Sequence, residues 1–253
     1  MRLENSFVPV EGVGERTERA LWRAGVTHWD AFDGAWADVP GVGPTLADRI
    51  RDFIEEGERR LAAGDARFFE AALPARERWR LVEDFRDRTA YLDIETTGLD
   101  RRWHDVTVVG VHRAGETTTL VRGRDLTAET LEAALGDAAL LVTFNGAQFD
   151  VPFLEAAFDT TLDLAHVDLR YPCGRLGLTG GLKAIEAAVG IERDRPDLDG
   201  FEAVRLWHAY ERGDDAALET LLAYNREDVV HLEGLMELVA GRLHETVFEA
   251  ALG

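Results

Sequence analysis

Two acidic residues inside an apolar strand constrain the possible fold of this chain more than any other feature. Residues 91–98 read Tyr-Leu-Asp-Ile-Glu-Thr-Thr-Gly, which is typical of a buried strand that ends in a turn. Positions i and i+2 of a strand point to the same face, so Asp93 and Glu95 should stand side by side. Two like charges near a core are costly unless a cation lies between them. The stretch therefore predicts a divalent-cation site, and two solvated acids at a strand end are the alternative.

The composition is that of a folded globular protein of one large or two smaller domains. The 253 residues are 46% hydrophobic, and no apolar run reaches the roughly 18 residues that a membrane helix needs. Residues 1–5 lack an apolar signal core, so we expect a cytoplasmic protein with no membrane partner. Cys173 is the single cysteine, which excludes an internal disulfide and a zinc cluster and is typical of a small buried apolar residue.

The charge balance is strongly acidic, with a formal net charge of −20 and a single lysine, Lys183, among 28 basic residues. By itself this balance argues against nucleic-acid binding, which uses basic surfaces. An acid-rich, lysine-poor composition resembles that of proteins from halophilic archaea, where surface charge maintains solubility in concentrated salt. At molar salt the Debye length is about 3 Å, so the repulsion of a polyanion is screened. The negative charge therefore counts only weakly against a nucleic-acid partner.

One turn motif occurs twice near the N-terminus, about 29 residues apart. Gly12 and Gly14 flank a valine before one helical pattern, and Gly41 and Gly43 flank a valine before the next. Glycine allows a close backbone approach, and a helix N-terminus offers free N–H groups that suit a phosphate. The repeat resembles the tandem helix-hairpin-helix domain, a sequence-independent binder of DNA backbones whose hairpin glycines these four residues match. The alternative is a small helical bundle used for protein contacts or as a cap.

The chain changes character at Thr89, where helical patterns give way to strands. Residues 61–88 are charged and helix-prone, and Pro74 should separate two helices of this linker. The order strand, strand, strand, helix, strand then predicts an α/β fold whose mixed sheet has helices on both faces. We expect an all-α domain at residues 1–60 and the α/β domain at residues 89–253. The expected strands are residues 89–95, 106–112, 116–121, 138–144 and 161–170, and the expected helices include residues 127–136, 180–190, 200–212 and 214–240.

A second acidic stretch follows the fourth expected strand. Asn145 and Gly146 end that strand with turn chemistry, and a helix should begin around Pro152. Asp150 then lies at the transition from strand to helix. An aspartate there is either an ordinary helix N-cap or a metal ligand, and the residues alone leave both roles open.

The expected strand at residues 161–170 carries three further potential ligands, Asp163, His166 and Asp168. Isolated polar residues are common at a sheet edge, and this is the simpler interpretation of all three. A metal site made from them is the alternative.

The last expected helix, at residues 214–240, brings a third acid to the interior. Asp228 falls within the apolar stripe of this helix, and Tyr224 lies one turn earlier on the neighbouring ridge. A buried acid needs a partner, and a metal shared with the first strand would supply one. The alternative is an acid at the edge of the stripe that reaches solvent. The stripe consists of Leu218, Leu221, Leu222, Asn225, Asp228, Val229, Leu232, Met236 and Val239.

The order and content of the three acidic stretches resemble the DEDD exonucleases of the ribonuclease H-like superfamily. The Tyr-x-x-x-Asp spacing of Tyr224 and Asp228 is that of the tyrosine-type (DEDDy) branch. The stretch from Asn145 to Leu154 is similar to family B polymerase proofreading domains. Residues 89–240 most resemble the YprB-like group of stand-alone exonuclease domains.

This resemblance implies a metal-dependent 3′→5′ exonuclease that hydrolyses phosphodiester bonds of DNA or RNA by a two-metal mechanism. Tyr224 would orient or deprotonate the attacking water. A non-catalytic nucleic-acid-binding or scaffold protein on the same fold and a structure-specific endonuclease are the alternatives, and the sequence names no protein partner. The two Mg²⁺ or Mn²⁺ ions would be held by Asp93, Glu95, Asp150 and Asp228. The terminal nucleotide would be contacted by Thr96, Gly98, Asn145 and Gly146, and a phosphate by Lys183.

Overall fold

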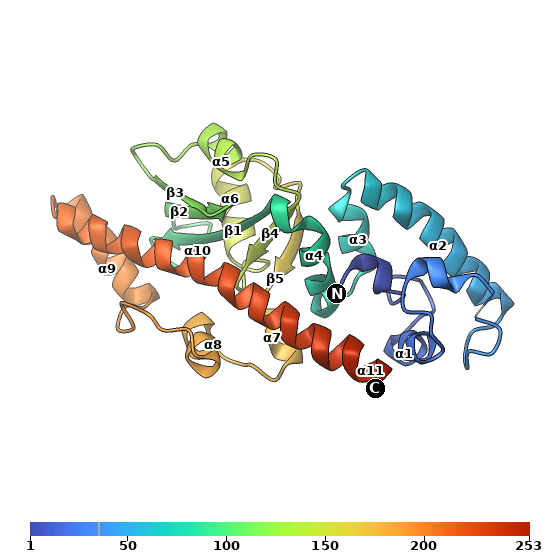
Figure 1. Cartoon of the computed structure of the whole chain (residues 1–253). Coiled ribbons are helices and arrows are strands. Elements are labelled where there is room, and N and C mark those ends of the chain that lie inside the picture. The colour runs from blue at the N-terminus through green and yellow to red at the C-terminus, as the bar shows by residue number, and fades with distance from the viewer. Residues whose placement is uncertain (35) are drawn as a thin grey trace.

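The computed structural model describes residues 1–34 and 36–253. A five-stranded sheet with helices on its faces lies beside a helical N-terminal region, and the long helix α10 (Asp215–Leu243) runs along both (Figure 1). The expected fold class, a mixed α/β sheet with a small helical N-terminal region, is confirmed. Within the described residues, no helix combines the length and the apolar character that crossing a membrane requires.

The sheet is mixed, with the strand order β3-β2-β1-β4-β5. The central strand β1 pairs antiparallel with β2 on one side and parallel with β4 on the other, and β5 extends the parallel half. A parallel pair needs a crossover connection, and α5 and α6 supply the two crossovers. The strands are β1 (Thr89–Thr96), β2 (Val106–Arg113), β3 (Glu116–Val121), β4 (Leu140–Thr143) and β5 (Ala165–Asp168).

Alternation along β1 assigns its side chains to two different faces of the sheet. Leu92 and Ile94 belong to a core shared with α5 and α6, whereas Tyr91 belongs to the core that contains the second half of α10. Asp93 and Glu95 therefore face α10, as the i and i+2 spacing predicts. Burying each large apolar side chain stabilises the fold by about 1.5–3 kcal/mol, and this fixes which face the acids occupy.

The helices of the α/β part follow the sequence expectations closely, with one instructive difference. Helix α6 begins at Asp150 and not at Pro152, and its N-cap is Phe149, which makes no side-chain capping hydrogen bond. The N-cap role considered for Asp150 is therefore wrong. The remaining helices here are α5 (Ala128–Leu135), α6 (Asp150–Phe158), α7 (Arg170–Arg175), α8 (Leu182–Val189), α9 (Gly200–Glu211) and, after α10, η5 (His244–Glu249) and α11 (Ala250–Leu252).

The described part of the N-terminal region consists of helices joined by turns, and most of the following linker is helical as well. Pro74 separates α3 from the 3-10 helix η3, as expected. The elements are η1 (Leu3–Asn5), α1 (Glu15–Arg23), η2 (Trp29–Phe32), α2 (Pro44–Ala62), α3 (Ala66–Ala72), η3 (Ala75–Leu81), α4 (Val82–Phe85) and η4 (Arg86–Arg88).

The two glycine turns of this region adopt the same backbone structure. Gly12 and Gly41 have φ values of +96° and +90°, which favour glycine, and Gly14 and Gly43 are the N-caps of α1 and α2. The hydrogen bonds repeat as well, because the valine after each first glycine donates its N–H to the carbonyl three residues earlier, at 2.9 and 3.1 Å.

The two copies also face each other. A Cβ on Gly12 would lie 3.3 Å from Leu46 of α2, and a Cβ on Gly41 would lie 3.8 Å from Thr17 of α1. Thr17 and Leu46 are the third residues of their helices, so each turn meets the equivalent position of the other copy.

A buried ion cluster joins this region to the linker. The Arg80 guanidinium, which is fully buried, donates to both carboxylate oxygens of Glu18 at 2.7 and 2.9 Å and to Glu77 at 3.0 Å. The C-terminal end of the chain packs on the same region, where the Phe248 ring contacts Trp22 edge to face at 5.0 Å. Both chain ends lie near this junction (Figure 1).

Candidate metal centre

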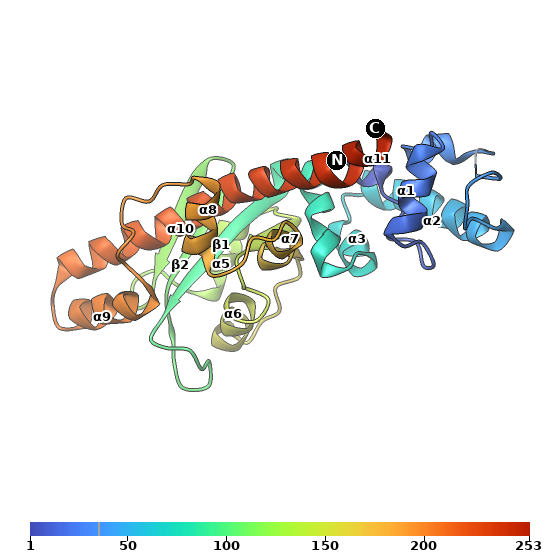
Figure 2. The same cartoon turned by 90° about the horizontal axis from the view of Figure 1, so that it is seen from below.

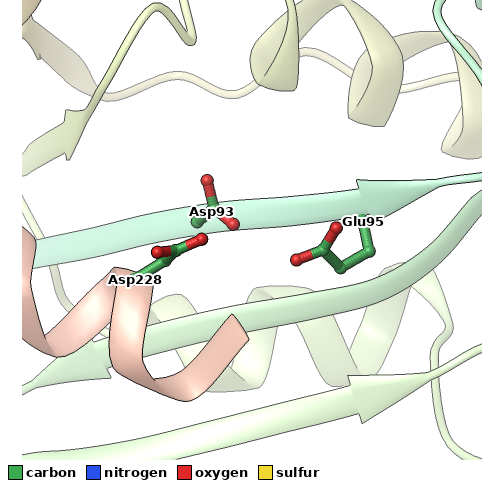
Figure 3. A group of neighbouring side chains, drawn as sticks. All are labelled: Asp93, Glu95 and Asp228. Carbon is green, nitrogen blue, oxygen red and sulfur yellow. The ribbon is translucent and has the colours of Figure 1, made fainter. Parts of the chain in front are cut away.

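Three carboxylates from two elements, two of them buried and one half-buried, meet on the α10 side of the sheet. Asp93 and Glu95 come from β1 and Asp228 comes from α10, and one oxygen of each lies within 4.8 Å of the others. Figure 3 shows the three carboxyl groups converging on the space between the strand and the helix. Glu95 is 7% and Asp228 is 5% exposed and Asp93 is half-buried, so none of the three acids lies free in solvent. The solvated alternatives considered for these residues are therefore wrong.

The cluster has the properties of a site that needs a cation. Burial raises the pKa of Asp93 and Glu95 well above its usual range, and the charges of Asp228 and Asp150 raise it further. Glu95 Oε1 is buried and has no hydrogen-bond partner among the described residues. Carboxylate oxygens are the ligands that Mg²⁺ and Mn²⁺ prefer, so the donor set fits such an ion.

Asp150 lies close to this cluster but outside the group of three. It occupies the first turn of α6 and is 3% exposed. Burial raises the pKa of Asp150 to about 7, and the backbone N–H groups of Asp150 and Ile94 oppose the rise. Since its charge also raises the pKa of Asp93 and Glu95, Asp150 is electrostatically part of the site. Its role as a metal ligand stays a prediction.

Asn225, the residue after Tyr224 in α10, holds the first acid of the cluster. Its Nδ2 donates to Asp93 Oδ2 at 3.1 Å and to the Asp93 carbonyl at 3.3 Å. This contact requires α10 to lie directly on the sheet. Gly110, which pairs with Asp93 across β1 and β2, permits the approach, since a Cβ there would stand 2.3 Å from Asn225 Oδ1.

Two cations lie beside the Tyr224 ring. Lys183 Nζ is 4.9 Å and Arg193 Cζ is 5.9 Å from the ring centroid. Lys183 Nζ is buried and has no hydrogen-bond partner in the part of the chain that the structure describes. Burial raises the pKa of the Tyr224 hydroxyl well above its usual range, and Asp228 raises it further. Tyr224 is therefore a neutral hydroxyl, able to donate or accept a hydrogen bond.

The turn after β4 is held by Asp168. The carboxylate of Asp168 accepts the backbone N–H groups of Asn145 at 2.7 Å, Ala147 at 3.2 Å and Arg170 at 3.1 Å. These bonds keep Asn145 at a φ of +65°, which an asparagine tolerates but seldom adopts. Gly146 is needed at the next position, because a Cβ there would lie 2.3 Å from Thr143 Oγ1.

The metal site considered for Asp163, His166 and Asp168 is wrong. Asp163 is exposed and pairs with Arg67 at 2.7 Å, and His166 lies 2.8 Å from Thr143 Oγ1. Asp168 binds backbone groups instead, so the three potential ligands serve three different neighbours. Among the described residues, only Asp93, Glu95 and Asp228 form a group with metal-ligand spacing.

A cleft of about 740 Å³ opens beside the carboxylates. Thr96 and Gly98, which follow Glu95, line it together with Leu99 and with Phe201 at the start of α9. Asn145, Gly146 and Lys183 are absent from the described lining of this cleft. The four N-terminal glycines precede α1 and α2, which lie at the other end of the molecule from α9 (Figures 1 and 2). The predicted nucleic-acid-binding residues therefore fall into two separate regions.

Sequence reasoning missed Arg193 and Glu186. The Arg193 guanidinium pairs with both Glu186 and Asp228, and its side chain is only 5% exposed. No sequence motif predicts a role for this arginine, since it lies in the charged loop between α8 and α9. The available signal was Glu186, an acid on the buried side of a short helix, which needs a cationic partner.

Comparisons with known proteins agree with this architecture. A family model named RNase_H_2, described as the RNase_H superfamily, matches residues 90–240. A family B DNA polymerase from the archaeon Pyrobaculum calidifontis is similar in structure, with 18% identity and a TM-score of 0.50 over 63% of this chain and 25% of the polymerase. NrnC from Brucella melitensis with bound Mg²⁺ has 20% identity and a TM-score of 0.48, over 68% of this chain and 81% of NrnC. No curated protein matches the chain. At such identities the likeness shows the fold alone.

Proposed function

Because the chain belongs to the RNase_H superfamily, we propose that it is a metal-dependent exonuclease that hydrolyses nucleic acid from the 3′ end. The observation that carries this proposal is the convergence of Asp93, Glu95 and Asp228 within 4.8 Å at the wall of a cleft. Three acids at such spacing, two of them buried and one half-buried, lower the stability of the fold, so a function explains them better than folding does.

Asp93, Glu95, Asp150 and Asp228 would hold two Mg²⁺ or Mn²⁺ ions, which supply an activated water and stabilise the leaving 3′ oxygen. Asn225 orients Asp93 through its hydrogen bond of 3.1 Å. The Tyr224 hydroxyl would align the attacking water. This role needs a group that both donates and accepts a hydrogen bond, and the raised pKa keeps the hydroxyl in that neutral form. The tyrosine-type assignment rests on this role.

The cleft would receive the terminal nucleotide between the turn after β1 and the start of α9. Thr96 and Gly98 line it and would contact the sugar and phosphate. Lys183 carries a buried ammonium that would neutralise a phosphate near Tyr224. Asn145 and Gly146 lie outside the described lining, and we assign them the positioning of the strand-to-helix turn that carries Asp150.

The N-terminal region would bind the nucleic-acid backbone as a tandem helix-hairpin-helix. Gly12, Gly14, Gly41 and Gly43 are exposed, and α1 and α2 have no side-chain cap at their N-termini. Free N–H groups at two matching turns suit two phosphates. Because the surface is acidic, concentrated salt would screen its repulsion of the nucleic acid, which suits a protein of the halophilic, YprB-like type.

A cleavage assay tests the proposal. The wild-type protein and Asp93→Asn are incubated with 5′-labelled DNA and RNA oligonucleotides, with Mn²⁺ or Mg²⁺, in concentrated potassium chloride. We expect wild-type protein to produce a ladder of shortened products and Asp93→Asn to produce none. Asp163→Asn, at an exposed aspartate outside the cluster, is the matched control.

Two outcomes would replace the proposal. Cleavage of circular substrates would indicate an endonuclease. Binding of nucleic acid without metal uptake or cleavage under any condition would indicate a non-catalytic protein on this fold.

A further inference from the structure

A single arginine connects the metal cluster to the loop that leads to the cleft at Asp199. The loop between α8 and α9 meets α10 at the level of Asp228, and Arg193 points from it into the protein. Its Nη2 donates to Glu186 Oε1 at 2.9 Å and also to Asp228 Oδ1, and its Nε donates to Glu186 Oε2. One guanidinium thus bridges two buried carboxylates.

We propose that Arg193 is a positioning residue that fixes the Asp228 carboxylate for metal binding, through the chain Glu186–Arg193–Asp228. The inference rests on the proposed function, because it assumes that Asp228 ligates a metal. Residues behind a metal ligand typically change metal affinity by 10–100-fold when they are removed, because they hold the ligand in its binding orientation.

The far end of this chain is rigid. Glu186 is fully buried in α8, and its Oε1 also lies 3.1 Å from His231 Nδ1 on α10. Glu186 faces the guanidinium with both oxygens, and such a fork has a fixed geometry. Glu186 therefore fixes the position of the Arg193 guanidinium. The remaining hydrogen bond of the guanidinium fixes Asp228 Oδ1, and Asp228 Oδ2 stays available for a metal ion.

The charge of Glu186 explains why Arg193 does not replace the metal. Arg193 carries one positive charge, yet it lies between the carboxylates of Glu186 and Asp228. A third carboxylate is also near, with Glu227 Oε2 at 3.9 Å from Arg193 Nη1. The local charge therefore remains negative. The cluster of Asp93, Glu95 and Asp228 still requires cations, because Arg193 fixes the orientation of Asp228 without neutralising the charge of the cluster.

The same loop continues to the cleft. Asp194 donates its backbone N–H to Glu227 Oε1 at 2.6 Å, which attaches the loop to α10 next to Arg193. A few residues later, Asp199 and Phe201 line the cleft. The orientation of the metal ligand and the position of the cleft wall thus depend on the same attachment.

Calorimetric titration of the full chain with Mn²⁺, without nucleic acid, tests the inference. We expect Arg193→Ala to bind Mn²⁺ roughly 10–100-fold more weakly than wild type. Arg193→Lys should recover part of the affinity, because it keeps the charge but loses the fork. Arg195→Ala, at an exposed position in the same loop, removes the same charge and should bind like wild type.

A cleavage titration with Mn²⁺ separates positioning from general damage. In Arg193→Ala the Mn²⁺ concentration for half-maximal rate should rise, whereas the rate at saturating Mn²⁺ should stay within a few-fold of wild type. A merely structural loss would lower the saturating rate without moving the midpoint. If Arg193→Ala does not fold, as judged by circular dichroism, Glu186→Gln weakens the same chain without touching Asp228 and should shift affinity in the same direction.

Equal or tighter Mn²⁺ binding in the Arg193→Ala protein, or in Glu186→Gln if it is the variant used, overturns the inference. Failure of wild type to bind Mn²⁺ overturns the proposed function instead, so the two failures are distinguishable.

Discussion

Asn225 Nδ2 donates to Asp93 Oδ2 at 3.1 Å, which ties the middle of α10 to the central strand at the point where the carboxylates gather. Asn225 is fully buried, so this hydrogen bond is not shared with solvent. Asn225 and Asp228 are three residues apart and therefore lie on one face of the helix. The register of α10 on the sheet thus sets both the orientation of Asp93 and the approach of Asp228.

Removal of this donor should impair the site more than it impairs the fold. In Asn225→Ala, Asp93 loses its only side-chain donor among the described residues, so we expect a cleavage rate roughly tenfold lower, from about 1.4 kcal/mol of lost alignment. Asn5→Ala is the matched control, because it also removes a partly buried hydrogen bond from a side-chain amide, here to the Thr27 carbonyl at 2.9 Å. Equal rates in the two variants, measured on labelled oligonucleotides, would contradict the assignment.

Gly110 should tolerate no side chain. In Gly110→Ala the new Cβ would stand 2.3 Å from Asn225 Oδ1 and 2.9 Å from Val229 Cγ1, so α10 must shift off the sheet. We expect a loss of about 1–3 kcal/mol in the free energy of unfolding, together with a large loss of cleavage. Gly234→Ala, at an exposed position of the same helix with open space around it, should instead be neutral or stabilising. Chemical denaturation of both variants measures the difference.

The metal-free protein should lose stability as pH rises from about 4 to about 7. Asp150 has an ordinary pKa of 3.8 when unfolded and about 7 when folded, so between these values the folded state binds more protons than the unfolded state. The free energy of unfolding therefore falls with rising pH, by on the order of 4 kcal/mol for this group.

Thermal melting in a chelator at pH 5 and pH 8 measures this effect. Asp150→Asn, which cannot ionise, should show a shallower fall than wild type. Addition of Mn²⁺ should restore the wild-type melting temperature at pH 8, because the cation replaces the protons. A melting temperature independent of pH in the chelator would show that the cluster carries no such penalty.

Much of the fold was predictable because local patterns are strong where one face of an element is buried. The apolar strands are predictable from runs of neighbouring residues. The start of α5 is predictable from its N-cap, Thr127. The start of α6 was misjudged because Pro152 is a favoured first-turn residue, yet here two helical residues precede it. Asp150 is consequently a buried acid within the helix and not its cap.

The site was predictable only where its residues follow one another within an element. Asp93 with Glu95 and Tyr224 with Asp228 are close in sequence, so periodicity brings them together. Arg193 meets Asp228 through a loop without regular structure, and no periodicity predicts such a contact. The role of Asp168 in holding the turn after β4 is not predictable either, since its partners are backbone N–H groups, which carry no sequence signature.

The buried cluster of Arg80, Glu18 and Glu77 yields a prediction about the whole molecule. Arg80→Met leaves the buried Glu18 carboxylate without its cation, whereas Glu77 keeps its ion pair with Arg175. This change should lower the free energy of unfolding by about 3–5 kcal/mol. Combining it with Glu18→Gln should recover much of this loss, because the uncompensated buried charge is then removed while Glu77 keeps Arg175. The amide oxygen introduced at position 18 can still accept the N–H groups of Phe7 and Val8, which the Glu18 carboxylate accepts in the wild-type protein.

Arg60→Met, at an exposed ion pair, should have no measurable effect and is the control. Denaturant unfolding compares the variants, and an Arg80→Met protein as stable as the control would show that this cluster does not hold the N-terminal region to the rest of the chain.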